Sequence, residues 1–121
     1  MEIKETMKEV HKNAIDKGLW ETFNLPRVLM LIVSEVTEAM EADRDGRRTG
    51  VSVLGVNGWV DDNDFTDAFK SNVKDTIEDE LADICMRVFD LAEKMEIDLE
   101  QHIKAKMRYN ALRQFKHGKK Y

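Results

Sequence analysis

Apolar side chains recur every three or four positions along most of this chain. The most regular stretch covers five turns and consists of Ile77, Leu81, Ile84, Val88, Leu91 and Met95. This spacing places side chains on one face of an α-helix, whereas a half-buried strand would alternate apolar and polar residues. The chain is therefore expected to fold as amphipathic helices.

Helix start and stop signals divide the chain into four predicted helices. The signals are Gly18 after residues 2–17, Pro26 and Gly46 around the second helix, Asp75 with Glu78 before the third, and Asp98 with Gln101 before a fourth that runs to about Phe115. Between the second and third helices, residues 47–70 contain glycines, the alternation "VSVLGV" and the acidic cluster "DDND", which indicate a loop or a short hairpin. The prediction is an all-α four-helix bundle in a single domain of residues 1–121.

Composition and charge exclude several classes of protein. The net charge of −5 argues against nonspecific nucleic-acid binding, which needs a broad basic surface. The longest apolar run, residues 28–33, is too short to cross a membrane, and the charged N-terminus lacks a signal-peptide core. The single cysteine, Cys85, cannot form an internal disulfide and is expected to be a small core residue. We expect a cytoplasmic protein with no membrane or nucleic-acid partner.

Two pairs of acidic residues, each spaced by three, lie in the predicted second and third helices. Glu35 falls among apolar residues and must face the interior, with Glu38 at its border, while Glu80 and Asp83 lie at the edge of the other apolar stripe. Buried carboxylates are costly unless a cation or hydrogen bonds compensate them. Four converging carboxylates without histidine or cysteine favour a hard cation, Mg²⁺ or Mn²⁺.

Two other interpretations assign different partners to these acidic residues. A di-iron site needs Glu-x-x-His on two helices, and none of the three histidines has a glutamate three residues before it. In the second reading, Asp83 pairs with Arg87 one turn on and Glu38 is solvated. The chain would then be a noncatalytic helical module that binds a partner or a nucleotide.

Four segments carry a resemblance to a known family. The motifs "SEVTEAMEA" and "EDELADI" resemble the Glu-x-x-Glu and Glu-x-x-Asp halves of the MazG-like, all-α nucleoside triphosphate pyrophosphohydrolases. The first half of the chain resembles the dCTP pyrophosphatases of that superfamily, with His11, Trp20, Phe23 and Pro26 ahead of the first motif, and the tail "KMRYNALRQFKHGKKY" resembles the segment after their last helix. Together the matches cover most of residues 8–45 and 74–121.

The resemblance implies magnesium-dependent hydrolysis of a (d)NTP to (d)NMP and pyrophosphate, in the upkeep of nucleotide pools. It implies that Glu35, Glu38, Glu80 and Asp83 hold Mg²⁺, and Glu38 is favoured as the catalytic residue that orients water. It also implies a homodimer or homotetramer, as does an apolar stripe that a short bundle leaves uncovered.

The substrate-binding residues predicted are His11 and Trp20 near the base, and Arg87, Lys106, Asn110 and Arg113 near phosphate or sugar oxygens. The last three share one side of the fourth helix, where they could equally form a solvated face. Trp20 could equally be a core residue. The dCTP enzymes tend to have an aromatic residue after each acidic motif and this chain does not, so its base preference is open.

Overall fold

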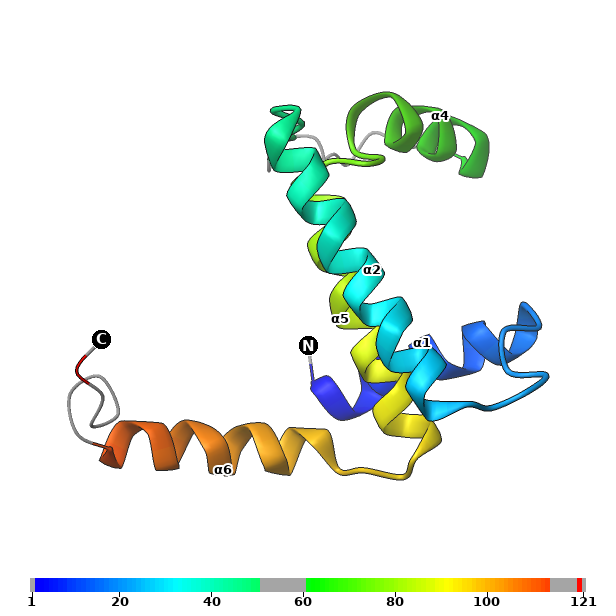
Figure 1. The fold of residues 1–121 in the computed structure, drawn as a ribbon. Coiled ribbons are helices and arrows are strands. Elements are labelled where there is room, and N and C mark those ends of the chain that lie inside the picture. Colours follow the sequence, from blue (N-terminus) through cyan, green and yellow to red (C-terminus); the bar gives the residue numbers. More distant parts are fainter. Residues whose placement is uncertain (1, 51–60, 114–119, 121) are drawn as a thin grey trace. The chain divides into compact units, whose positions relative to one another are not determined.

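The computed structural model describes residues 2–50, 61–113 and 120 of the chain. Within these ranges it contains five helices and no strand (Figure 1). The helices are α1 (Ile3–Asp16), α2 (Leu25–Arg44), α4 (Asp62–Asn72), α5 (Ile77–Lys94) and α6 (Leu99–Leu112). The predicted all-α class is confirmed, and none of the described helices is long and apolar enough to cross a membrane.

Helix α4 lies in the segment that was predicted as a loop, and it raises the number of described helices from the predicted four to five. Asp61 caps α4, because its carboxylate accepts a hydrogen bond from the Asp64 N–H at 2.8 Å. Phe65 and Phe69, one turn apart, pair with ring centroids 5.9 Å apart. The acidic residues in the first turn of α4 also stabilise the helix, because they lie at the positive end of its dipole. The predicted hairpin at "VSVLGV" lies outside the described residues.

The predicted start of the third helix is wrong by one residue. Helix α5 begins after Thr76, whose hydroxyl accepts a hydrogen bond from the Asp79 N–H at 3.3 Å. The Asp79 carboxylate in turn accepts from the Asp75 N–H at 2.9 Å. Asp75 has φ +65° and so lies outside the helix in the left-handed region. The cap is therefore Thr76 with Asp79 rather than Asp75 with Glu78.

The other predicted helix ends agree with the structure over the described residues. Gly18 and Gly46 adopt φ values of +79° and +68° after α1 and α2. Asp98 accepts a hydrogen bond from the Gln101 N–H at 3.2 Å at the start of α6. Helix α6 ends at Leu112, short of Phe115, which lies outside the described residues.

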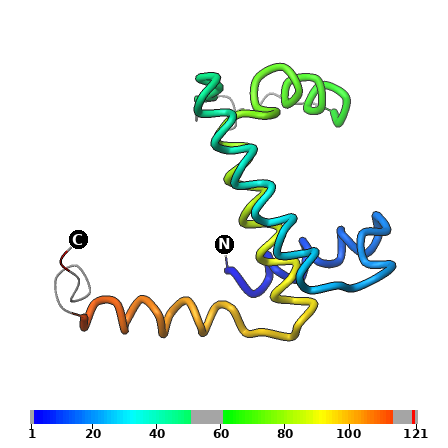
Figure 2. Tube along the Cα trace, in the orientation of Figure 1, coloured from blue at the N-terminus to red at the C-terminus, as the bar shows by residue number. Residues whose placement is uncertain are grey.

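The chain divides into two compact units, a central unit of residues 23–88 and a terminal unit of residues 1–22 and 89–121. In the central unit, α2 and residues 77–88 of α5 run antiparallel and side by side (Figure 2). The Ile77 N–H donates to the Arg47 carbonyl at 3.1 Å at one end, and Arg87 bonds Glu35 further along.

The terminal unit contains α1, the end of α5 and α6. Helix α1 contacts α6 in this unit. Among the described residues of this unit, the buried apolar side chains come from α1 and α5 and are Met7, Ala14, Leu91 and Ala92. In the central unit the buried apolar residues include Ala42, near the end of α2, and Val73, which follows α4. Cys85 is exposed, so its predicted core position is wrong.

Candidate functional site

Three of the four predicted metal ligands converge in the central unit. One carboxylate oxygen from each of Glu35, Glu38 and Glu80 lies within 4.8 Å of the others. We call these three residues the carboxylate cluster. Glu35 and Glu80 are only 7% and 5% exposed, whereas Glu38 is exposed, so the interior position predicted for Glu35 and the border position of Glu38 are both found.

Glu35 has a cationic partner on the opposite helix. The Nε–H of Arg87 donates to Oε1 of Glu35 at 2.7 Å. Burial raises the pKa of the Glu35 carboxyl, but the hydrogen bond from Arg87 and the bond with Glu38 more than offset it, and the pKa lies below its ordinary 4.5. Arg87 therefore spans α5 and α2 instead of pairing with Asp83 along α5.

The other two members of the cluster are pushed toward the protonated form. The hydrogen bond with Glu35 and the charge of Glu35 raise the pKa of the Glu38 carboxyl. Burial, followed by the charges of Glu38, Asp83 and Glu35, raises the pKa of Glu80 to about 7. The Oε2 atom of Glu80 is buried and has no hydrogen-bond partner among the described residues. A buried carboxylate oxygen without a partner is unfavourable and calls for a proton or a cation.

Asp83, the fourth predicted ligand, is not part of the group held within 4.8 Å. It is half-buried on α5, one turn from Glu80 and Arg87. Burial and the charges of Asp79 and Glu35 raise the pKa of its carboxyl. Asp83 therefore adds negative potential to the carboxylate cluster without having an oxygen at its centre.

A second acidic group shares Glu80 with the cluster. Oxygens of Asp75, Asp79 and Glu80 lie within 4.8 Å of one another at the start of α5. Asp79 is already used by the cap, since its carboxylate accepts from the Asp75 N–H. The partnerless Glu80 oxygen is thus bordered by acids on two sides.

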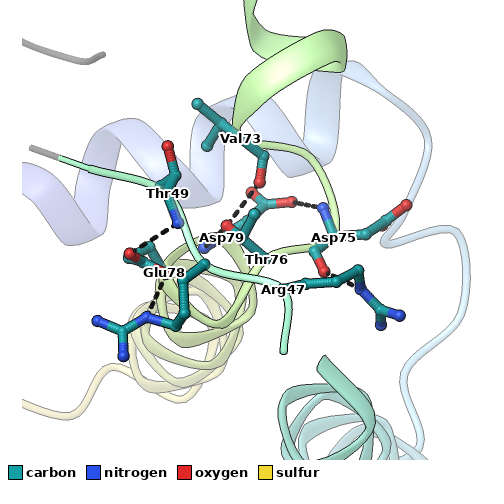
Figure 3. Close-up of polar contacts among 8 residues, drawn as sticks. Arg47, Thr49, Val73, Asp75, Thr76, Glu78 and Asp79 are labelled. Atoms are coloured by element: carbon teal, nitrogen blue, oxygen red, sulfur yellow. Dashed lines mark hydrogen bonds and ion pairs between the residues drawn. The ribbon is translucent and has the colours of Figure 1, made fainter. Parts of the chain in front are cut away.

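The segment that follows α2 is attached to the first turn of α5 beside these acids (Figure 3). The Thr49 N–H donates to Oε2 of Glu78 at 3.0 Å, and the Nε–H of Arg48 donates to Oε1 of Glu78 at 3.1 Å. Burial raises the pKa of Glu78, but bonds from its own N–H, from Thr49 and from Arg48 bring the pKa below its ordinary value. These contacts fix residues 47–49 against α5.

The two predicted base-binding residues, His11 and Trp20, meet in the terminal unit through a third residue, Asp90. Nδ1 of His11 lies 2.7 Å from Oδ1 of Asp90. The indole Nε1–H of Trp20 donates to both oxygens of Asp90, at 2.8 and 3.0 Å. The rings of His11 and Trp20 meet edge to face with centroids 5.6 Å apart, and the ammonium of Lys94 lies 5.8 Å from the Trp20 ring centre. We call His11, Trp20 and Asp90 the Asp90 cluster.

Asp90 was missed from the sequence. It lies in the same polar row of α5 as Asp83, Arg87 and Lys94, so its position on the helix gives no sign of a special role. The usable signal was chemical: a half-buried indole N–H needs an acceptor, which can come from a residue far along the chain.

The predicted phosphate contacts on α6 also lie in the terminal unit. Lys106 and Arg113 approach the ring of Tyr109, with Nζ and Cζ 5.0 and 5.3 Å from its centre. Asn110 is exposed, and its carbonyl accepts a hydrogen bond from the Arg113 N–H at 3.3 Å. Lys106 and Arg113 thus both approach one exposed aromatic ring.

Comparison with known proteins gave no match to any family model, curated protein or solved structure. A function for this chain must therefore be inferred from its own side chains.

Proposed function

We propose that this protein is a magnesium-dependent nucleoside triphosphate pyrophosphohydrolase, which converts a (d)NTP and water to a (d)NMP and pyrophosphate. The observation that carries the proposal is the carboxylate cluster with its buried, partnerless Glu80 oxygen. Such an arrangement is unfavourable in the bare protein and becomes favourable when a cation is bound. The MazG-like motifs that supply these residues point to the same chemistry.

The donor set suits Mg²⁺ or Mn²⁺. Glu35, Glu38 and Glu80 offer only carboxylate oxygens, which hard cations prefer, and no histidine or cysteine belongs to the group. Asp83 is proposed as an outer residue that strengthens the negative potential. When bound, the ion would neutralise phosphate charge and lower the pKa of a bound water.

Glu38 is proposed as the residue that orients and deprotonates the attacking water. It is the exposed member of the carboxylate cluster, so solvent and substrate can reach it. In the metal-free protein the hydrogen bond with Glu35, followed by the charge of Glu35, raises the pKa of its carboxyl. A general base must be within reach of water, and Glu38 meets this requirement.

The contacts to the rest of the nucleotide are proposed as the family resemblance implies them. His11 and Trp20 would contact the base, with an imidazole for hydrogen bonding and an aromatic face for stacking. Lys106, Asn110, Arg113 and Arg87 keep their proposed roles toward phosphate and sugar oxygens. The proposed location is the cytoplasm, where the enzyme would hydrolyse nucleoside triphosphates in the upkeep of the nucleotide pool.

The proposed partner is a second copy of the chain, in a homodimer or homotetramer. Four exposed apolar residues follow each other along one face of α2 at helical spacing and form what we call the α2 stripe: Leu29, Val33, Val36 and Met40. Their side chains are between 48% and 58% exposed. A continuous apolar row of this kind is typical of an interface.

A magnesium titration monitored by thermal unfolding tests the proposal. The wild type should be stabilised by Mg²⁺, by about 2.7 kcal/mol at a hundred times Kd, whereas Glu35→Gln and Glu80→Gln should lose this stabilisation. Asp43→Asn, an exposed acid on the same helix as Glu35, is the matched control and should respond like the wild type. In parallel, common and damaged triphosphates are screened for pyrophosphate release. Absence of both magnesium stabilisation and pyrophosphate release would refute the proposal.

The α2 stripe favours one other candidate, a noncatalytic helical module that binds a partner protein through this face. In that case the acids hold no cation, and Mg²⁺ at millimolar concentration would leave the melting temperature of the wild type and of Glu80→Gln equally unchanged. The same titration therefore separates the two candidates.

A further inference from the structure

A pocket of about 400 Å³ in the central unit joins part of the carboxylate cluster to two cationic residues. It is lined by Glu38, Glu41, Arg47, Lys74, Asp75 and Glu80. Neither Arg47 nor Lys74 was singled out from the sequence.

We propose that Arg47 and Lys74 form a phosphate-binding subsite in this pocket, next to the cation held by Glu38 and Glu80. The subsite would take the phosphate oxygens of a nucleoside triphosphate or of the pyrophosphate that leaves. This inference rests on the proposed function and adds to it the residues that hold the leaving group.

Arg47 is held in place by both neighbouring helices. Its N–H donates to the Ala42 carbonyl at 2.8 Å, which ends α2. Its carbonyl accepts from the first N–H of α5, that of Ile77, at 3.1 Å. Its Nε–H donates to the Asp75 carbonyl at 2.7 Å, as Figure 3 shows. The guanidinium is therefore positioned before any ligand arrives.

The Arg47 guanidinium keeps donors for a ligand. An arginine has five N–H groups in a planar fork. Nε bonds the Asp75 carbonyl and Nη1 pairs with the Asp45 carboxylate, which leaves further N–H groups in the fork. The side chain is 39% exposed, so phosphate oxygens can reach it.

Lys74 lies on the turn between α4 and α5. Its N–H donates to the Phe69 carbonyl at 2.9 Å, so the backbone of the turn is fixed. Its Nζ is 3.6 Å from Asp75, and the side chain is 57% exposed. Exposed ion pairs of this length are weak, so the ammonium can turn to a stronger anion.

The net charge of the residues that line the pocket determines which ligands it can bind. Four acids and two cations line it, which leaves two negative charges when all the acids are ionised. A free polyanion would be repelled, but one Mg²⁺ would cancel this excess. Arg47 and Lys74 would then bind phosphate oxygens that the ion also attracts. The pocket should therefore bind phosphate only in the presence of a divalent cation.

Variants of the two cations and of their neighbours test the subsite. Arg47→Gln and Lys74→Gln are compared with Arg48→Gln, an adjacent arginine that pairs with Glu78 and does not line the pocket, and with Lys70→Gln on α4. Calorimetry with Mn²⁺-loaded protein measures binding of inorganic pyrophosphate and, separately, of an α,β-imido nucleoside triphosphate, which cannot be cleaved at the reactive bond. Thermal unfolding of each variant without ligand shows whether it is folded.

We expect Arg47→Gln and Lys74→Gln each to weaken binding of both probes about tenfold, because each loses a charge-assisted hydrogen bond, and the two control variants to bind like the wild type. Arg47→Lys should recover only part of the affinity, since lysine lacks the fork. Should Arg47→Gln unfold, Lys74→Gln and Arg47→Lys decide the question.

The outcomes separate this inference from the proposed function. Normal affinity of folded Lys74→Gln and Arg47→Lys, with the wild type releasing pyrophosphate from a triphosphate, overturns the subsite and leaves the enzyme. Weakened pyrophosphate binding in these variants, with no turnover by the wild type, keeps the subsite and overturns the enzyme. Equal binding of pyrophosphate with and without Mn²⁺ overturns the dependence on the cation and therefore the subsite.

Discussion

The Nε–H of Arg87 and the Oε1 atom of Glu35 are joined across two antiparallel helices by a hydrogen bond of 2.7 Å. Arg87 therefore supplies positive charge to a buried carboxylate whose other neighbours, Glu38 and Glu80, are acids. A cation bound at the carboxylate cluster would share Glu35 with Arg87. Arg87 therefore balances the charge of Glu35 in the metal-free protein and is also a candidate phosphate contact.

Replacing Arg87 with glutamine should destabilise the metal-free protein. Glu35 would keep its burial and lose its cation, and because Arg87 is partly exposed we expect a loss of about 1–2 kcal/mol in the free energy of unfolding at neutral pH. Saturating Mg²⁺ should reduce the deficit, since the ion replaces the missing charge. Urea unfolding with and without Mg²⁺ measures both values, with Arg108→Gln as control. An equal deficit in the two conditions would contradict the role in charge balance.

The carboxyl of Glu80 should make the metal-free protein less stable as pH rises. Its pKa of about 7 exceeds the ordinary 4.5, so the folded state holds a proton that the unfolded state releases between these values. The stabilisation is complete below pH 4.5 and is lost as pH passes through 7. Glu80→Gln should therefore match the wild type near pH 5 and exceed it at pH 8.5, by at most about 3 kcal/mol at 1.36 kcal/mol per pKa unit. Glu41→Gln is the control.

Saturating Mg²⁺ should reverse that order, because the wild type gains the stabilisation of the ion and Glu80→Gln does not. Thermal unfolding at pH 5 and pH 8.5 gives all four comparisons. A difference between wild type and Glu80→Gln that is the same at both pH values would show that the substitution acts through packing alone.

Asp83→Asn should weaken magnesium binding less than Glu80→Gln does. Asp83 contributes potential without an oxygen at the centre of the carboxylate cluster, which resembles the role of an outer partner of a metal site. Loss of such a partner typically costs about 10- to 100-fold in affinity, and we expect the lower end of that range. The measurement is the Mg²⁺ concentration at half-maximal pyrophosphate release. Equal losses in the two variants would place Asp83 among the direct ligands.

Asp90→Asn should weaken the contacts of both rings of the Asp90 cluster. Asparagine keeps one neutral acceptor oxygen, so the second contact with the Trp20 N–H is lost and the remaining contacts with Trp20 and His11 lose the assistance of the negative charge. In a Trp59→Phe background, Trp20 gives the sole indole N–H resonance, which should move upfield in the variant. The tautomer of neutral His11, read from its imidazole nitrogen shifts, should become mixed. Glu93→Gln, a neighbour on α5, is the control for a general change in the helix.

A charge placed in the α2 stripe should dissociate an oligomer built on it. Val36→Glu adds a carboxylate at the centre of the apolar row, and burying it at an interface would be unfavourable. We expect light scattering to give a multiple of the chain mass for the wild type and the mass of one chain for the variant. Thr37→Glu, an exposed polar position next to it, should leave the mass unchanged. A monomeric, active wild type would refute the interface.

The parts of the fold that were predicted correctly depend on local side-chain spacing. The interior position of Glu35 was predicted from its place in the apolar arc of α2. The helix ends at Gly18 and Gly46 were predicted because glycine readily adopts the left-handed backbone that both residues have in the structure. Helix α4 was missed because its few apolar residues, Phe65 and Phe69 among them, form only a narrow stripe. The capping signal at Asp61 could have revealed it.

The parts that were missed depend on neighbours far along the chain. The partner of Arg87 was sought one turn away and lies 52 residues away. The link between Asp90 and His11 spans 79 residues. Arg47 became a candidate only when its contacts with both helix ends were known, because its type and its position after α2 are ordinary for a solvated residue.

One residue, Arg47, joins the end of α2 to the start of α5 through its own N–H and carbonyl. The bond from the Ile77 N–H forms only while both helix ends are in place, so the amide proton of Ile77 should exchange with deuterium only when the end of α2 and the start of α5 separate. If its exchange matches that of amides within α5, the two helices open as a single cooperative unit. In that case the carboxylates of Glu38 and Glu80 remain close together until the whole unit opens, and smaller local openings leave their arrangement unchanged.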